Sequence, residues 1–130
     1  MRDPKYLINS KEFKSTGAIL WPDYWHQSKS NPVFDILNIT CSHTHYQQES
    51  GQLLIHRERH WKPLQLSYYM NEQTDLYYRL FLGDKETFYL SWKALNASYH
   101  FIRRWLSTVG FLNPDGKILD SYSKICCRCR

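Results

Sequence analysis

The chain has 130 residues and a net charge of +5, with 17 Lys and Arg against 12 Asp and Glu. Its hydrophobic fraction of 42% is normal for a globular protein and argues against disorder, and its length is that of one domain or a piece of one. Three of the excess positive charges lie in the last seven residues, so the sequence does not show the long basic stripe of a nucleic-acid-binding surface. It has no run of 18 apolar residues and no signal peptide at its start, so it predicts neither a membrane span nor a leader.

The first third of the chain predicts one strand and one helix. Residues 1–16 are polar and are expected to be irregular, with Ser10 in a position like that of a helix cap. The apolar run 17–21 predicts a strand that ends at Pro22, because proline has no N–H to donate to a sheet. The Asn-Pro pair at 31–32 predicts the start of a helix. The residues expected to face inward from it are Val33, Phe34, Ile36 and Leu37.

The middle and the end of the chain predict further strands. Residues 41–48 are expected to form a polar loop, and residues 51–55 a second strand. This strand ends in continuous apolar residues, which is typical of a central position in a sheet. Residues 99–109 are expected to continue as strand or loop, and residues 113–116 predict a turn.

A first helix is predicted over residues 57–71. Pro63 is tolerated there only in the first turn, which requires the helix to begin near Trp61. Apolar residues at three- and four-residue spacing predict one buried stripe. The stripe consists of Trp61, Leu64, Ser67 and Tyr68.

Two more helices are predicted before residue 96. The first covers 76–82, begins at a cap formed by Thr74 or Asp75, and ends at Gly83 in a left-handed conformation. The second covers 85–95, with Asp84 as its cap and Glu86 favourable in its first turn. Its apolar face is expected to consist of Phe88, Trp92 and Leu95.

Three short strings hold the candidate site residues. Glu49 and its neighbours are poor strand formers, so a ligand or another group is expected to approach the backbone of the strand at these residues. A buried Glu49 needs a partner or a cleft, because an unpaired buried carboxylate costs several kcal/mol. Asp84 is the best single candidate for a catalytic residue, although a role as helix cap explains it equally well. Trp21, Tyr24 and Trp25 could stack on a sugar ring or simply pack.

We predict no metal site from the histidine and cysteine residues. His56 and His60 could share a helix face, which is expected to be exposed to solvent, and they do not match the metalloprotease pattern. Cys41 and the two histidines after it could offer ligands, but a polar loop explains them as well. The cysteines at 126–129 fit no zinc spacing.

Two Asn-x-Ser/Thr triplets, at residues 38–40 and 96–98, match the acceptor pattern for N-linked glycans. Such triplets also arise by chance. The sequence therefore leaves open whether either is used.

Five motifs keep a fixed order and spacing from about Lys14 to about Gly116. They are TGAILWPDYW at 16–25, ESGQLLI at 49–55, RHW at 59–61, YMN at 69–71 and GDKETF at 83–88. Together they resemble the fungal α-mannosyltransferases of the Golgi, the family of the yeast α-1,2 and α-1,3 enzymes that branch cell-wall mannan.

This resemblance implies the fold and the activity of the parent protein. The expected fold is α/β and GT-A-like, of which the chain would be the acceptor-side half. The expected reaction is retaining transfer of mannose from GDP-mannose to a mannoside or glycoprotein glycan. The resemblance also implies Mn²⁺ at the donor diphosphate, a type II membrane protein and a location in the Golgi lumen, with no nucleic acid as partner.

The resemblance also assigns roles to residues of this chain. Asp84 and Glu49 would be catalytic, and no residue here would be a metal ligand. The residues expected to bind substrate are Ser50, Gly51, Gln52, Lys85, Trp21, Asp23 and Trp25.

Some features of the chain depart from the family. It contains no Asp-x-Asp, the motif in which the family binds its metal, and no anchor. We therefore expect an irregular segment at 1–13, a partial catalytic domain at 14–116 and an atypical basic, Cys-rich tail at 117–130. The tail indicates a frameshift, a missed intron or a truncated gene model. The alternatives are a non-catalytic sugar-binding or interaction module and, more remotely, a nucleic-acid binder.

Overall fold

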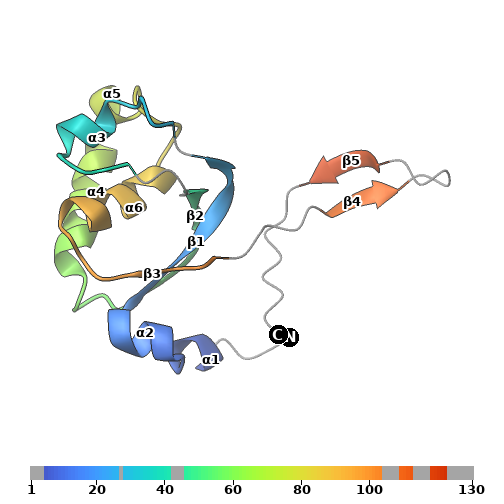
Figure 1. The fold of residues 1–130 in the computed structure, drawn as a ribbon, viewed down its shortest axis with the longest axis horizontal. Coiled ribbons are helices and arrows are strands. Elements are labelled where there is room, and N and C mark those ends of the chain that lie inside the picture. Colours follow the sequence, from blue (N-terminus) through green and yellow to red (C-terminus); the bar gives the residue numbers. More distant parts are fainter. Residues whose placement is uncertain (1–4, 27, 42–45, 104–108, 113–117, 123–130) are drawn as a thin grey trace.

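A computed structural model describes residues 5–26, 28–41, 46–103, 109–112 and 118–122 (Figure 1). The helices are α1 (Lys5–Ile8), α2 (Lys11–Thr16), α3 (Val33–Ile36), α4 (Trp61–Glu72), α5 (Thr74–Tyr77) and α6 (Lys85–Ala94). The strands are β1 (Ala18–His26), β2 (Tyr46–Ile55), β3 (His100–Phe101), β4 (Val109–Leu112) and β5 (Ile118–Tyr122). The turn predicted at 113–116 and the cysteines at 126–129 lie outside the described residues, as do the two histidines that follow Cys41.

The fold is mixed α/β, built on a sheet in the order β2-β1-β3. β1 pairs with β2 in antiparallel and with β3 in parallel orientation, so the first strand is central and the second lies at an edge. The prediction of a central second strand is therefore wrong. Residues 18–22 of β1 are all buried, whereas most of β2 is only half-buried, and an apolar run does not distinguish these two situations.

β1 also continues through Pro22 to His26 instead of ending at Pro22. Pro22 is registered opposite Gln48, and the pairing of β1 with β2 is irregular on both sides of it, after Leu20 and before His26. A proline is tolerated in a strand where the ladder of hydrogen bonds is already interrupted. The broken register thus explains why the proline does not terminate the strand.

The polar N-terminal segment forms α1 and α2 instead of irregular structure. The predicted cap is confirmed: Ser10 Oγ accepts a hydrogen bond from the Phe13 N–H at 3.2 Å. At its other end α2 stops at Gly17, which adopts a left-handed φ of 75°. The polar composition gave no helical signal, because both helices lie at the surface and bury no residue.

The helix start at 31–32 is confirmed, since Asn31 Oδ1 accepts the N–H of Val33 at 3.0 Å. Val33 and Phe34 of α3 are buried and Leu37 packs against the core. Ile36 instead faces solvent. Four helical residues make little more than one turn, so only part of the expected inward face reaches the core.

α4 begins at Trp61, as Pro63 in the first turn requires. Its buried residues are Pro63, Ser67 and Met70, so the predicted stripe is wrong for Trp61 and Tyr68, which are exposed. Ser67 faces inward as the stripe predicts, with its Oγ 2.9 Å from Thr87 Oγ1 on α6, but the buried face includes Pro63 and Met70 on the side away from Tyr68.

α5 is shorter than the predicted helix 76–82, and no side chain caps it. Gly83 follows with the left-handed φ of 76° that was expected. α6 covers the predicted range to within a residue, with Trp92 fully buried, Phe88 half-buried and Leu95 exposed. Near the C-terminus β4 and β5 pair in antiparallel orientation on either side of the turn predicted at 113–116.

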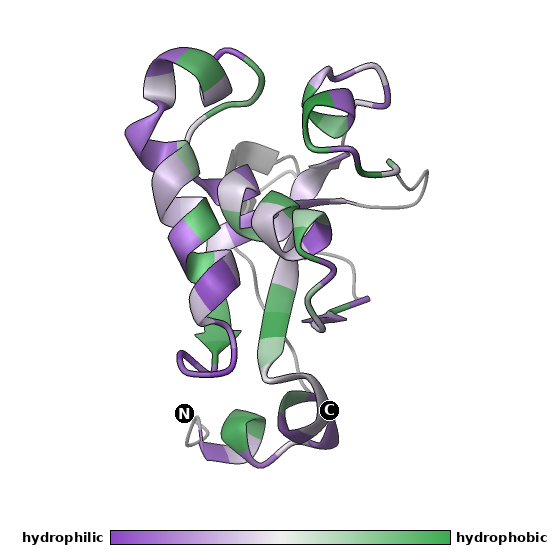
Figure 2. Cartoon of the chain, turned by 90° about the vertical axis from the view of Figure 1, so that its left-hand side faces the viewer, coloured by the Kyte–Doolittle hydropathy of each residue, from purple (hydrophilic) through white to green (hydrophobic). Residues whose placement is uncertain are grey.

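The core lies where the helices cover one face of the three-stranded sheet (Figures 1 and 2). Its buried members are Leu20, Val33, Phe34, Met70, Tyr77, Phe81, Tyr89 and Leu90. They come from β1 and from the segment 33–90. The first turn of α6 lies over the paired strands, since Lys85 contacts β1 and Glu86 contacts β2. Within the described part of the chain, no helix has the length and apolar character needed to cross a bilayer.

Candidate functional site

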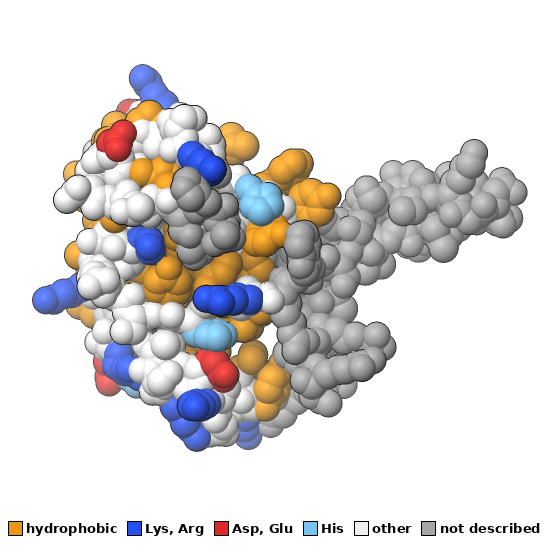
Figure 3. Space-filling model, in the orientation of Figure 1, with side chains coloured by type: hydrophobic (Ala, Val, Ile, Leu, Met, Phe, Trp, Pro, Cys, Tyr) orange, Lys and Arg blue, Asp and Glu red, His pale blue; other side chains and the backbone are white. Residues whose placement is uncertain are grey.

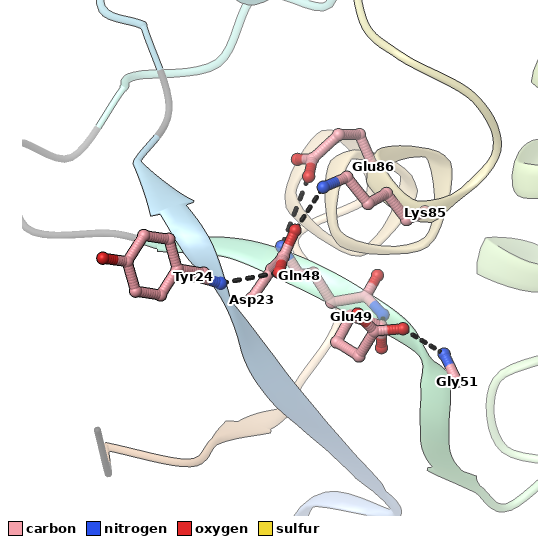
Figure 4. Close-up of polar contacts among 7 residues, drawn as sticks. All are labelled: Asp23, Tyr24, Gln48, Glu49, Gly51, Lys85 and Glu86. Atoms are coloured by element: carbon pink, nitrogen blue, oxygen red, sulfur yellow. Dashed lines mark hydrogen bonds and ion pairs between the residues drawn. The ribbon is translucent and has the colours of Figure 1, made fainter. Parts of the chain in front are cut away.

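Three distant segments meet where the first turn of α6 crosses β1 and β2 (Figure 4). Lys85 Nζ forms an ion pair with Asp23 Oδ2 of β1. The other oxygen, Asp23 Oδ1, accepts the N–H of Tyr24 at 2.6 Å. Beside this pair, Glu86 Oε1 accepts the N–H of Gln48 on β2 at 3.3 Å. The contacts join the strings predicted at 17–25 and 83–88 to the strand that carries 49–55.

Glu86 is the residue of this cluster that sequence reasoning missed. It was noted only as a favourable acid in the first helical turn, but it is buried. Burial raises its pKa to about 7, while Lys85 and the Gln48 N–H oppose the rise and Asp23 adds to it. A carboxyl group with this pKa can gain or lose a proton near neutrality. Its spacing of three and four residues from the buried Tyr89 and Leu90 was the signal that could have placed it inward.

β2 carries a large irregularity beside the cluster. Leu20 is registered opposite Leu53, but the next residue of β1, Trp21, is opposite Glu49. Residues 50–52 therefore bulge out of the ladder, and bulges commonly mark sites where a strand re-aims its side chains. Three predicted substrate-binding residues lie on this bulge: Ser50, Gly51 and Gln52.

Glu49 has the partner that its position requires. Its Oε1 accepts the N–H of Gly51 at 2.7 Å, within the bulge itself. A Cβ at Gly51 would lie 3.0 Å from the same oxygen, so glycine leaves room for this contact. The carboxylate thus fixes the shape of the bulge, and the structure gives it no contact with Asp23 or Lys85.

Asp84 lies outside the cluster's contacts. Asp84 occupies the predicted N-cap position of α6, but its side chain is exposed and makes no capping hydrogen bond. The backbone takes over, since the Asp84 carbonyl accepts both the N–H of Thr87 at 3.0 Å and the Thr87 hydroxyl at 2.6 Å. Asp84 is left as a free surface carboxylate one residue before Lys85.

The aromatic residues of β1 separate into a buried and an exposed group. Trp21 is buried, with 7% of its surface exposed, whereas Tyr24 and Trp25 are 55% and 63% exposed. The rings of Tyr24 and Trp25 meet edge to face at 5.4 Å. Trp25 therefore offers a ring to a ligand, while Trp21 serves mainly to pack this end of the strand.

His60 is buried, which corrects the prediction of a solvent-facing pair; His56 alone is exposed. His60 Nε2 donates to the Thr16 carbonyl at 2.8 Å, and its ring lies 5.4 Å from that of Trp92. Burial lowers its pKa, with smaller contributions from the charges of Arg59 and His56. The residue joins the start of α4 to the end of α2 and has no contact with the Glu86 cluster.

The described residues do not fit the Mn²⁺ that the resemblance implies. Among them, no three His, Cys, Asp or Glu side chains converge to hold a metal ion. Cys41 is half-buried and packs against the core. We therefore derive no step through a metal from these residues.

Comparison with known proteins gives a family and several relatives. A family model described as a mannosyltransferase matches residues 1–48 and 36–128. The alpha-1,2-mannosyltransferase MNN21 of Candida albicans is 28% identical over 87% of this chain and 24% of its own length. MNN23 of the same organism is 24% identical over 88% of the chain and 27% of its own length. MNN2 of Saccharomyces cerevisiae is 23% identical over 85% of the chain and 26% of its own length.

The chain thus spans about a quarter of the length of these curated relatives. No solved structure matches it. The comparisons therefore bear on the family and leave the fold of the longer relatives open.

Proposed function

The chain belongs to the mannosyltransferase family, and from this premise we propose that it is the acceptor-side part of an α-mannosyltransferase catalytic domain. The proposed reaction is transfer of mannose from GDP-mannose to a mannoside or glycoprotein glycan, with retention at the anomeric carbon. We propose a GT-A-like fold for the whole domain and the Golgi lumen as its location. The relatives' names favour an α-1,2 linkage.

One observation carries this proposal: two of the family-like strings, far apart in sequence, are joined by the ion pair of Asp23 and Lys85. The string at 49–55 lies on the neighbouring strand, where Glu49 is registered opposite Trp21. Packing alone does not require a paired acid and base at this position. A half-buried carboxylate held by an ammonium group is well suited to accept hydrogen bonds from sugar hydroxyls.

The chemistry proposed for these residues is to bind and orient the acceptor. Asp23 keeps lone pairs for a sugar hydroxyl beyond those used by Lys85 and the Tyr24 N–H. The exposed ring of Trp25 would stack on the apolar face of a mannose unit. Mn²⁺, which the family implies at the donor diphosphate, would be held by residues that are not in this chain.

The 130-residue chain by itself is expected to release no GDP from GDP-mannose. It contains no Asp-x-Asp to hold a metal at the donor phosphates. The measurement is coupled detection of GDP with and without Mn²⁺ and an α-mannoside acceptor. Release above the level of a heat-denatured sample would contradict the division of the domain proposed here.

A graft tests the function directly. Residues 14–116 replace the matching segment of the Candida MNN21 relative, and transfer of mannose to an α-mannoside is measured. We expect the graft to be active and Asp23→Asn in it to lower transfer about tenfold, the usual effect of losing one charge-assisted hydrogen bond. Glu72→Gln, which removes an exposed carboxylate of α4, is the matched control and should leave transfer unchanged. A graft that melts cooperatively but transfers no mannose would contradict the proposal.

The second candidate is a sugar-binding module without catalysis, which the exposure of Trp25 specifically favours. On either candidate, Trp25→Ala is expected to weaken binding of an α-mannoside about fivefold, since a stacked ring contributes about 1 kcal/mol. Trp61→Ala is the control, because Trp61 is 55% exposed but lies on α4. Isothermal titration of the full chain measures both. Binding that persists unchanged in Trp25→Ala would exclude the ring from the acceptor surface.

A further inference from the structure

The two Asn-x-Ser/Thr triplets occupy equivalent places in the fold, although 58 residues separate them. Asn38 follows the C-terminus of α3, and Asn96 follows the C-terminus of α6. Both residues adopt a left-handed backbone, with φ of 50° and 48°. Among the described residues they are the only ones other than glycine with a positive φ.

The backbone around each asparagine forms the same closing motif. The N–H of Asn38 donates to the Asp35 carbonyl at 3.1 Å, and the N–H of Ile39 reaches back to Phe34 at 2.9 Å. The same two bonds follow α6. The N–H of Asn96 donates to the carbonyl three residues before it at 3.1 Å, and the N–H of the next residue donates to the carbonyl five residues before it at 2.9 Å. This pair of bonds defines a Schellman motif, whose left-handed position takes glycine or asparagine.

The motif explains the asparagine backbones but does not use their side chains. Both side chains are exposed, and within the described part of the chain neither amide group has a hydrogen-bond partner. The amides of Asn31 and Asn71, in contrast, donate to Leu80 and Ser67 carbonyls. The nitrogen that would accept a glycan is thus free in the triplets and engaged in these other asparagines.

The hydroxyl residues are also placed for an acceptor site. The Schellman motif requires nothing of the residue two positions after the asparagine, yet Thr40 and Ser98 stand there, and both are exposed. The middle residues, Ile39 and Ala97, turn inward and are half-buried. Each triplet therefore anchors its centre and presents both ends of the acceptor pattern to solvent.

We propose that Asn38 and Asn96 are sites of N-linked glycosylation. The amide nitrogen attacks the anomeric carbon of an oligosaccharide linked to a polyprenyl diphosphate, and a C–N bond replaces the C–O bond to that diphosphate. The polyprenyl diphosphate leaves, and one amide proton is lost. The proposal rests on the lumenal location within the proposed function, because the donor is used in the secretory lumen.

The fold is compatible with a glycan at both positions. The glycan extends from the side-chain nitrogen into solvent, so no buried contact and no backbone hydrogen bond of the motif is lost. The left-handed backbone is also unaffected, because the attachment lies beyond Cβ.

The test directs the full chain into the lumen of a yeast by a cleavable secretory leader. An N-glycosidase that converts glycosylated asparagine to aspartate then marks each site for mass spectrometry. We expect conversion at both residues and an increase in gel mobility after digestion. Asn38→Gly and Thr40→Ala should each remove one step of the mobility shift, and Thr40→Ser should restore it. At the second site, Asn96→Gly and Ser98→Ala should likewise each remove one step of the mobility shift.

Glycine is the chosen replacement because it keeps the left-handed backbone, so a lost glycan is not confused with a misfolded chain. A secreted, folded chain with no conversion at either asparagine would overturn the proposal. The result is independent of catalysis: the leader supplies the location, and a failure of mannose transfer would leave the glycans in place.

Discussion

Gly17→Ala is expected to lower the free energy of unfolding by about 3 kcal/mol. Gly17 has a left-handed φ of 75°, which costs other residues about 1–2 kcal/mol. A Cβ there would also lie 2.9 Å from His60 Nε2 and 3.1 Å from Arg59 Cζ. His60 cannot yield cheaply, because it is buried beside Trp92 and donates to the Thr16 carbonyl. Moving it would sacrifice that hydrogen bond.

The chain provides a matched control in Gly83. Its φ of 76° is nearly the same, but a Cβ at Gly83 would meet nothing within 4 Å. Gly83→Ala should therefore show only the conformational cost of about 1 kcal/mol. Urea denaturation of both variants measures the difference. Equal losses in the two variants would show that the contact with His60 carries no free energy.

The same junction shows why two basic residues precede α4. Arg59 donates from its two terminal nitrogens to the carbonyls of Lys14 and Ser15, at 3.1 and 2.9 Å, and His60 takes the next carbonyl. Three successive carbonyls at the end of α2 are thus satisfied by side chains from a segment 44 residues or more away. Cations are favourable at helix C-termini. The RHW motif therefore has a structural role here that its sequence did not reveal.

Local signals predicted the parts of the fold that local chemistry determines. Ser10 and Asn31 act as predicted, and Gly83 has the predicted left-handed φ although the helix before it already ends at Tyr77, because a cap or a left-handed turn depends on one residue and its near neighbours. The buried face of α4 was not predictable in this way. It depends on how α4 packs against α6, where Ser67 meets Thr87, and the hydrophobic spacing within α4 does not encode that packing.

The residues of the candidate site also separate into those that were predicted and those that were not. Asp23 and Lys85 were predicted to bind substrate from the resemblance to the family, and the structure brings them together. Glu86 and Gln48 were not predicted, because their importance comes from burial between α6 and β2. Asp84 was favoured because its position at a helix start can be read from the sequence, but its backbone carbonyl, and not its side chain, accepts the N–H of Thr87.

Glu86→Gln is expected to change how stability depends on pH. The pKa of Glu86 is raised from 4.5 to about 7 in the folded chain, chiefly by burial. Between these values the folded state holds a proton that the unfolded state has lost, so stability falls as pH rises, by about 3 kcal/mol in total. Glutamine keeps an oxygen for the Gln48 N–H and carries no charge. The variant should therefore lack this loss.

The informative quantity is the free energy of unfolding of Glu86→Gln minus that of the unchanged chain. It should rise by about 3 kcal/mol from pH 4.5 to pH 8, so that the variant gains on the unchanged chain as pH increases. Contributions common to both proteins cancel, including that of His60, whose lowered pKa costs stability at acid pH. Glu72→Gln again controls for one lost negative charge at the surface. A difference that stays flat would mean that Glu86 is already ionised in the folded chain at acid pH, and the cluster would then present two carboxylates to Lys85.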